Sequence, residues 1–130
     1  MKVPNVVDSS GWLEYFIGSS RAQLFASAIE DTENLVVPII TIYEVFKKVL
    51  RERGENEALQ VASSMQSGSV VDLDIGITLD AARLQLPLAD SIIYATALRH
   101  GATLWTQDDH FEGLSSVRYF PLPPKSLRTI

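Results

Sequence analysis

The chain has 130 residues with 46% hydrophobic and 21% charged side chains, and its net charge is −5 at pH 7. This composition is typical of a globular protein, so we expect a single domain over residues 1–130 and exclude the disordered and fibrous classes. The longest apolar runs fall far short of the roughly 20 residues that a membrane-spanning helix needs, and the absence of cysteine excludes disulfides and thiolate zinc sites.

The first part of the chain predicts two strands separated by helices. Hydrophobic spacing gives, in order, a strand at residues 3–7, helices at 12–17 and 21–30, a strand at 34–39, and a long helix that ends at Gly54. At the start of the long helix, Thr41 and Glu44 match the S/T-x-x-E capping box, in which the two side chains cap the first turn.

The rest of the chain continues the alternation. We expect helices at residues 55–66, 75–86 and 89–100, strands at 69–73, 102–105 and 117–120, and a proline-rich tail. Alternating strands and helices predict an α/β fold, specifically a three-layer α/β/α sandwich with a central, mostly parallel sheet. The sequence contains neither G-x-x-x-x-G-K-[ST] nor G-x-G-x-x-G, so a nucleotide cofactor has no support.

Four acidic residues stand where a predicted strand ends or a predicted helix begins: Asp8, Glu44, Asp90 and Asp108. Each has a purely structural interpretation. Asp8 and Asp90 are candidate helix caps, Glu44 fits the capping box, and Asp108 fits a turn in which Asp109 is a competing acid. Independent capping would not require all four to fall at the same edge of one sheet, whereas a ligand site at the carboxyl ends of parallel strands would.

Carboxylates gathered in this way repel one another, so an empty cluster raises its pKa values or destabilises the fold. A hard cation resolves the repulsion, and oxygen ligands favour Mg²⁺ or Mn²⁺ over zinc. His100 and His110 are possible proton carriers, but each is an isolated histidine near a turn, and we interpret both as surface or internally hydrogen-bonded residues outside the catalytic set.

Four segments, at residues 6–10, 42–45, 86–97 and 104–111, together resemble the PIN domain. Within that family the chain is most similar to the small ribonuclease toxins of the VapBC toxin–antitoxin systems, and the resemblance covers nearly its whole length. The motifs that carry it are L-x-x-A-D-x-x-I-x-x-x-A on the helix at 89–100 and T-x-D-x-x-F after the strand at 102–105.

The resemblance implies a Mg²⁺- or Mn²⁺-dependent endoribonuclease, in which a metal-activated water cleaves RNA to leave a 3′-hydroxyl and a 5′-phosphate. The four acids would hold the metal, while Ser10, Thr106 and Asp109 would surround them. It further implies a small VapB-like antitoxin that wraps the toxin and often delivers a basic residue to the acidic pocket, and it implies a homodimer. The apolar residues of the first two helices, namely Trp12, Tyr15, Phe16, Leu24 and Phe25, either form such surfaces or belong to the core, and we favour the core for most of them.

An acidic protein repels nucleic acid at long range, so an RNA substrate requires a local basic patch. The candidates are Lys47, Lys48, Arg51 and Arg53 on the polar face of the long helix, with Arg21 opposite. Their alternative interpretation is an ordinary solvated helix face. RNA loops are recognised largely by shape and unstacked bases, so the target itself is not encoded in a readable motif.

Two other functions remain as alternatives. One is a catalytically inactive PIN-like module that binds RNA or serves as a scaffold. The other is a Mg²⁺-binding phosphoacceptor receiver domain, which is disfavoured because Asp8 is followed by serines and no lysine occurs after Thr106 until Lys125. The start of the chain lacks the long apolar stretch of a secretion signal, so we expect a cytoplasmic protein without a membrane partner.

Overall fold

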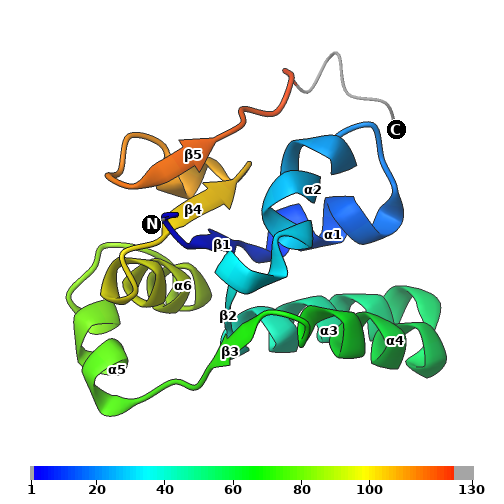
Figure 1. Ribbon diagram of the computed structural model, residues 1–130, viewed down its shortest axis with the longest axis horizontal. Coiled ribbons are helices and arrows are strands. Elements are labelled where there is room, and N and C mark those ends of the chain that lie inside the picture. Colours follow the sequence, from blue (N-terminus) through cyan, green and yellow to red (C-terminus); the bar gives the residue numbers. More distant parts are fainter. Residues whose placement is uncertain (1, 125–130) are drawn as a thin grey trace.

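The computed structural model describes residues 2–124, so Met1, the end of the proline-rich tail and Lys125 lie outside the described residues. Within this part, five short strands all pair in parallel (Figure 1). One sheet has the order β1 (Asn5–Val7), β4 (Thr103–Thr106) and β5 (Val117–Tyr119), and a second pair joins β2 (Val36–Pro38) to β3 (Ser69–Val71). A parallel bridge between Asn5 and Leu35 links the two, so β1 lies near the middle.

Consecutive residues in the strands face opposite sides of the sheet, and this alternation creates two cores. Val6, Val36 and Leu104 belong to one cluster of buried side chains, while their neighbours Val7, Val37 and Trp105 belong to the other. Both faces of each central strand are therefore buried, as the near-continuous apolar sequence of parallel strands requires.

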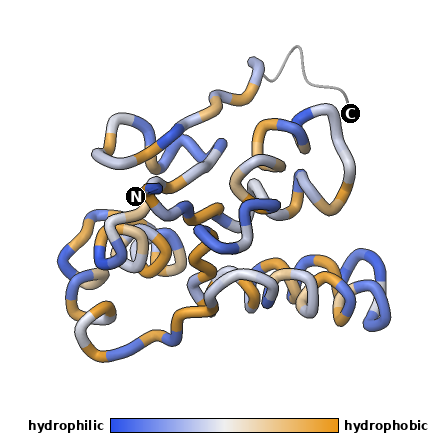
Figure 2. The backbone as a smooth tube through the Cα atoms, viewed as in Figure 1, coloured by the Kyte–Doolittle hydropathy of each residue, from blue (hydrophilic) through white to orange (hydrophobic). Residues whose placement is uncertain are grey.

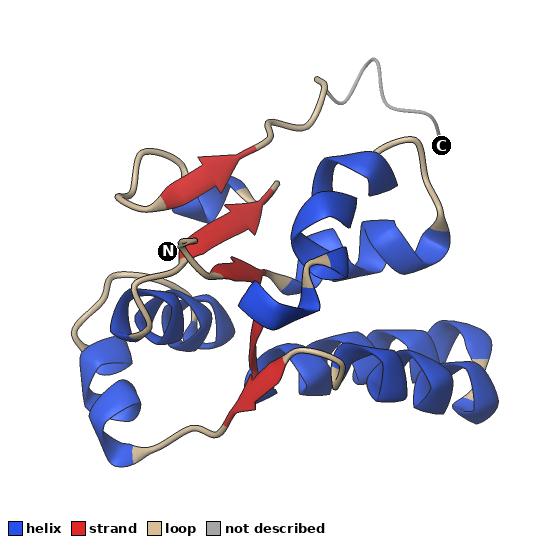
Figure 3. Cartoon of the chain, in the orientation of Figure 1, coloured by secondary structure: helices blue, strands red, loops and turns tan. Residues whose placement is uncertain are grey.

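Helices cover both faces (Figure 3). On the Val7 face lie α1 (Ser9–Ile17), α2 (Ala22–Glu30), α3 (Ile39–Arg53) and α4 (Glu55–Met65), and on the Val6 face α6 (Leu88–Arg99), with α5 (Ile75–Ala82) packed against it. Two short 3₁₀ turns, η1 (Thr32–Asn34) and η2 (Asp109–Phe111), complete the described elements. The expected three-layer α/β/α architecture is confirmed.

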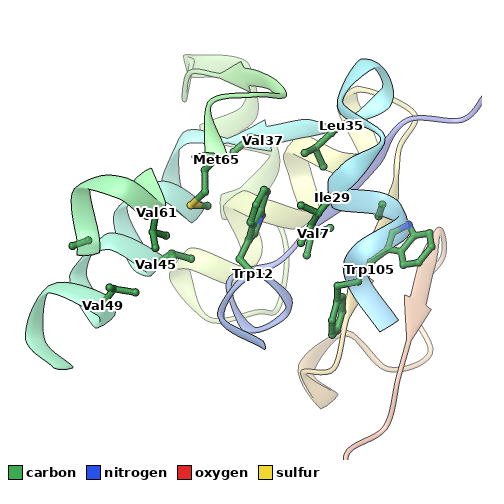
Figure 4. Close-up of a cluster of buried hydrophobic side chains, with 13 residues drawn as sticks. Val7, Trp12, Ile29, Leu35, Val37, Val45, Val49, Val61, Met65 and Trp105 are labelled. Atoms are coloured by element: carbon green, nitrogen blue, oxygen red, sulfur yellow. The ribbon is translucent and has the colours of Figure 1, made fainter. Parts of the chain in front are cut away.

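The larger core is centred on Trp12, which Figure 4 shows between side chains of α4 and those of β1 and α2. Trp12 and Phe25 are fully buried, whereas Tyr15, Phe16 and Leu24 are only partly buried and pack on the outside of this cluster. Figure 2 shows the corresponding distribution along the chain, with hydrophobic residues where β2 crosses the middle and hydrophilic residues at the turn between α3 and α4. Among residues 2–124, no helix combines the length and the apolar character needed to cross a membrane.

The prediction that Thr41 and Glu44 form a capping box is wrong. The helix α3 begins at Ile39, two residues earlier, and Pro38 occupies the cap position. Thr41 therefore lies within the first turn, where its hydroxyl donates to the Pro38 carbonyl oxygen, and the Glu44 carboxylate is left free for other partners. The same early start shortens the strand expected at residues 34–39 to Val36–Pro38, because a proline can end a strand but cannot donate to its ladder.

Other element boundaries differ from the predicted ones by a few residues or less. The helix expected at 75–86 ends at Ala82, while Gly18 and Gly54 end α1 and α3 with positive φ angles of 73° and 91°. Asp90 does not cap α6, because Pro87 holds the cap position and Asp90 falls in the first turn. Asp8, in contrast, is the N-cap of α1.

Candidate metal centre

The sheet topology brings the ends of β1 and β4 side by side. Asp8 directly follows β1, while Thr106 is the last residue of β4 and Asp108 lies two residues beyond it. Because the two strands are parallel neighbours, these side chains emerge at one edge. The first turn of α6 supplies Asp90, and the second turn of α3 supplies Glu44.

Asp8 is held at this edge by a complete set of hydrogen bonds. Its carboxylate accepts from the Gly11 backbone N–H at 3.0 Å, from the Ser10 hydroxyl at 2.8 and 3.0 Å, and from the Thr106 hydroxyl at 2.6 Å. The residue is only 3% exposed. Burial raises the pKa of Asp8 to about 6, although these hydrogen bonds oppose the rise and the charge of Asp108 adds to it.

Thr106 connects Asp8 to Asp108. Its hydroxyl donates to Asp8 and also accepts from the backbone N–H of Asp108 at 2.9 Å. Asp108 in turn accepts from the backbone N–H of His110 at 3.0 Å and caps η2. A single buried hydroxyl thus sets the orientation of one acid and the backbone position of another.

Glu44 is fixed by a different hydroxyl. Ser9, at the start of α1, donates to the Oε1 atom of Glu44 across the boundary between the two helices. Burial raises the pKa of Glu44, the Ser9 hydrogen bond opposes that rise, and the charges of Asp90 and Asp108 add to it. Glu44 is therefore coupled through charge to Asp90 and Asp108.

His110 sits between Asp90 and Asp108. Its Nδ1 atom lies 2.8 Å from Asp90 Oδ2 and 3.1 Å from Asp108 Oδ1. Burial raises the pKa of Asp90 despite the hydrogen bond from His110, and that hydrogen bond together with the charge of Asp108 raises the pKa of His110. His110 therefore bridges the two carboxylates, and their contacts favour its protonated form.

The donor set is suited to a divalent cation. Ligand atoms of Asp90, Asp108 and His110 all lie within 4.8 Å of one another, and the described residues contain no other such group. Asp8 and Glu44 are not part of that tight group, but both interact with Asp108 through charge. Carboxylate oxygens are the ligands that Mg²⁺ and Mn²⁺ prefer. Burial raises the pKa values of Asp8, Glu44 and Asp90, and a bound cation would favour their charged forms.

The structure also places the other residues singled out from the sequence. Ser10 and Thr106 contact Asp8 as expected of neighbours of the site, but Asp109 is exposed and affects the cluster only through its charge near His110. Sequence reasoning missed Ser9 and set His110 aside as a residue outside the catalytic set. An isolated histidine two residues after an acid carries no specific signal in a sequence, and its contact with Asp90 depends on how α6 packs.

The basic residues fall into two groups. Lys47, Lys48 and Arg51 lie on α3 beside Glu44, where they line a shallow groove of about 180 Å³ together with Tyr43. Arg21 lies elsewhere, and its guanidinium donates to Gln107 Oε1 at 2.7 Å and to the Phe120 carbonyl at 2.9 Å. These bonds tie Gln107 and the segment that follows β5 to the start of α2, so Arg21 is engaged in the fold, and its role as an RNA contact stays a prediction.

The fold is thus a three-layer α/β/α domain whose parallel sheet carries carboxylates at its carboxyl edge. The family model described as "PIN domain" matches residues 6–116, and the chain belongs to the PIN domain family. This membership removes the receiver-domain alternative. A comparison with curated protein sequences gives no significant match.

Solved structures of toxins share the fold. A toxin–antitoxin complex from Klebsiella pneumoniae has a TM-score of 0.74 and 21% identity, with 91% of this chain and 99% of that chain covered. VapC20 from Mycobacterium tuberculosis, described as a sarcin–ricin loop cleaving toxin, has a TM-score of 0.71 and 17% identity over 92% and 99% of the two chains. VapBC2 from Rickettsia felis, bound to a DNA fragment from its promoter, has a TM-score of 0.70 and 11% identity over 92% and 98%.

Proposed function

We propose that this PIN domain is a Mg²⁺- or Mn²⁺-dependent endoribonuclease that acts as the toxin of a toxin–antitoxin pair. The observation that carries the proposal is that ligand atoms of Asp90 and Asp108 lie within 4.8 Å of each other and of His110, while the Thr106 hydroxyl joins Asp108 to the buried Asp8. Glu44, whose pKa is raised by burial and by the charges of Asp90 and Asp108, is the fourth proposed ligand. A metal ion bound by these four carboxylates would lower the pKa of a water and neutralise charge on the phosphate that is cleaved.

The chain's own residues prepare this site. Ser10, Thr106 and the Gly11 N–H hold Asp8 in one orientation, and Ser9 does the same for Glu44. Groups that orient metal ligands in this way are worth about 10- to 100-fold in metal affinity or activity. His110 holds Asp90 and Asp108 together by its contacts with both, which keeps the two acids close in the metal-free protein.

RNA is the proposed substrate for two reasons. One similar structure is described as a toxin that cleaves the sarcin–ricin loop, which is an RNA cleavage activity on the same fold. In addition, α3 places Lys47, Lys48 and Arg51 beside Glu44, where they would attract phosphates in a chain whose overall charge is negative. Attack by water rather than by the ribose 2′-hydroxyl would leave a 3′-hydroxyl and a 5′-phosphate.

The proposed protein partner is a VapB-like antitoxin. Among the similar structures, one is described as a toxin–antitoxin complex and another as VapBC2. A groove of about 290 Å³ between α1 and the α3–α4 pair offers such a partner an apolar floor that includes Phe16, Val49 and Val61 with a charged rim that includes Lys48 and Glu52. The homodimer stays a prediction, which sedimentation of the purified protein tests.

The deciding experiment is cleavage of a mixed cellular RNA pool by the purified protein with Mg²⁺, with Mn²⁺ and with EDTA, followed by sequencing of the new ends. We expect defined internal cuts with either metal and none with EDTA. Intact RNA under all three conditions would instead support the catalytically inactive PIN-like module. The metals are tested separately because the carboxylate set accommodates both.

A further inference from the structure

The helix α3 exposes a stripe of side chains that winds gradually around the helix and passes beside Glu44. Ile39, Tyr43, Lys47 and Arg51 follow one another at intervals of four residues, and all four are exposed. In an α-helix this spacing places side chains on one face, about 6 Å apart along the axis. Glu44 neighbours Tyr43 in sequence and lines the same groove, so the stripe leads away from the acidic cluster.

The positive charge on this stripe is largely uncompensated. Lys48, on the adjacent row, forms an ion pair with Glu52 at 2.8 Å, whereas Arg51 only approaches Glu52 at 3.9 Å. Across residues 2–124, no carboxylate forms an ion pair with Lys47, whose ammonium instead lies 5.5 Å from the centre of the Tyr43 ring and 3.4 Å from its hydroxyl oxygen. Within residues 2–124, this acidic protein therefore has at least one lysine without a carboxylate partner, and a weakly paired arginine, beside Glu44.

Tyr43 is the aromatic residue on this stripe. Its side chain is 58% exposed, and the ring packs under Lys47 rather than into either core. Proteins that bind single-stranded nucleic acid combine a positively charged groove for the backbone with exposed aromatic rings on which bases stack. Tyr43, Lys47 and Arg51 supply both parts of that combination on one helix face.

We propose that Tyr43 stacks on an unpaired RNA base beside the phosphate that is cleaved, while Lys47 and Arg51 bind the phosphates that follow. The inference rests on the proposed RNA substrate and makes it more specific, because a base can stack on Tyr43 only when it is out of a duplex. The substrate is thus a single-stranded segment or loop. A protein partner is the less favoured occupant, since Lys47, which has no carboxylate partner among residues 2–124, and Arg51, whose ion pair with Glu52 is long at 3.9 Å, match a polyanion better than an apolar surface.

Binding is measured with a fluorescein-labelled single-stranded RNA oligonucleotide in EDTA and low salt, so that the RNA stays intact. Stacking of one base predicts that Tyr43→Ala weakens binding about tenfold, while Tyr43→Phe, which keeps the ring, binds like the parent. Leu59→Ala is the matched control, because Leu59 is an exposed side chain on α4 with 53% exposure. A duplex of the same sequence should bind equally to the parent and to Tyr43→Ala.

A scan with abasic nucleotides localises the contact. One abasic position should weaken binding by the parent, and the same position should have no effect on Tyr43→Ala, because the two changes remove one interaction. Equal binding by the parent and Tyr43→Ala, no binding by the parent, or additive effects in the scan would each overturn the inference. A change in sedimentation of Tyr43→Ala with unchanged RNA binding would overturn it in favour of a protein interface. Failure of the proposed nuclease itself is separate, since it shows only in the metal-dependent cleavage assay.

Discussion

The carboxyl edge of the sheet and the outer surface of α5 and α6 both carry acidic residues, but the two sets differ in their partners and in the direction of their pKa shifts. Asp80 on α5 forms ion pairs with Arg99 at 2.8 Å and Arg83 at 3.1 Å, and the Arg99 hydrogen bond lowers its pKa. Asp8 at the sheet edge accepts from two hydroxyls and a backbone N–H, has no arginine or lysine partner among residues 2–124, and has a raised pKa.

The difference shows which carboxylates have their charge neutralised by basic side chains of the fold. A surface carboxylate with two guanidinium partners needs no further cation, so it serves as an internal control for any metal effect. The acids at the sheet edge are oriented by hydrogen bonds but not neutralised by them, apart from the contribution of His110. An orienting shell without a neutralising charge is the arrangement expected of a cation site.

The largest expected effect is on catalysis. Asp90→Asn keeps the size of the side chain but removes one proposed metal ligand, and we expect the proposed metal-dependent RNA cleavage to fall on the order of 100-fold or more. Asp80→Asn, which removes a surface carboxylate of the same type, should cleave RNA at the parental rate. Initial cleavage rates of the two variants at matched Mg²⁺ provide the measurement, and equal losses would end the distinction between the two regions.

The next effect is on the stability of the metal-free protein. The pKa of Asp8 is about 6 in the folded protein, above its usual value of 3.8, so the folded state binds the proton more tightly than the unfolded state. Stability should therefore fall as the pH rises from about 4 through 6, and the loss from this one group approaches about 3 kcal/mol at neutral pH. Urea unfolding in EDTA at a series of pH values measures it.

Asp8→Asn separates this effect from other titrating groups. The neutral side chain should flatten the fall in stability above pH 4 and should unfold at higher urea than the parent at neutral pH in EDTA. Mg²⁺ should stabilise the parent and not the variant. A metal-free parent that is more stable at neutral pH than at pH 5, with a steeper rise than Asp8→Asn, contradicts the prediction.

A smaller loss is expected when only the orienting hydroxyl is removed. Thr106→Val has nearly the same shape but takes away the donor to Asp8 and the acceptor of the Asp108 N–H. We expect activity or metal affinity to fall about 10- to 100-fold, with the metal requirement for half-maximal cleavage raised. Thr78→Val is the matched control, since the Thr78 hydroxyl donates only to the Asp74 carbonyl on the exposed face of α5.

The sequence was sufficient to predict the fold class and the positions of Asp8 and Asp108 directly after β1 and β4. The regular alternation of apolar strands and amphipathic helices predicts the sandwich, and acids that follow strands such as Asp8 and Asp108 necessarily reach its carboxyl edge. The capping box at Thr41 and Glu44 failed because Pro38 starts α3 two residues earlier than the motif suggests. A local motif is therefore weaker evidence than the geometry of the whole sheet.

The partners of the acids were harder to predict, because they come from other elements. Ser9 meets Glu44 only where α1 crosses α3, and His110 meets Asp90 only where η2 lies against the start of α6. The paired residues lie on different elements far apart in the sequence, so no motif predicts either contact. Arg21 shows the reverse case, in which a basic residue that was a candidate for RNA binding is used to anchor Gln107 and Phe120.

The smallest effect is expected at Asp80, and its sign is opposite to that at Asp8. Because its folded pKa is lowered, Asp80 contributes stability that is present above its usual pKa and is lost as the pH falls through the folded value. Asp80→Asn should therefore lower the urea midpoint slightly at neutral pH and not at pH 3, and high salt should shrink the difference because exposed ion pairs are screened. If Asp80→Asn and Asp8→Asn shifted stability in the same direction at neutral pH, the contrast between a neutralised surface acid and an acid awaiting a cation would be lost.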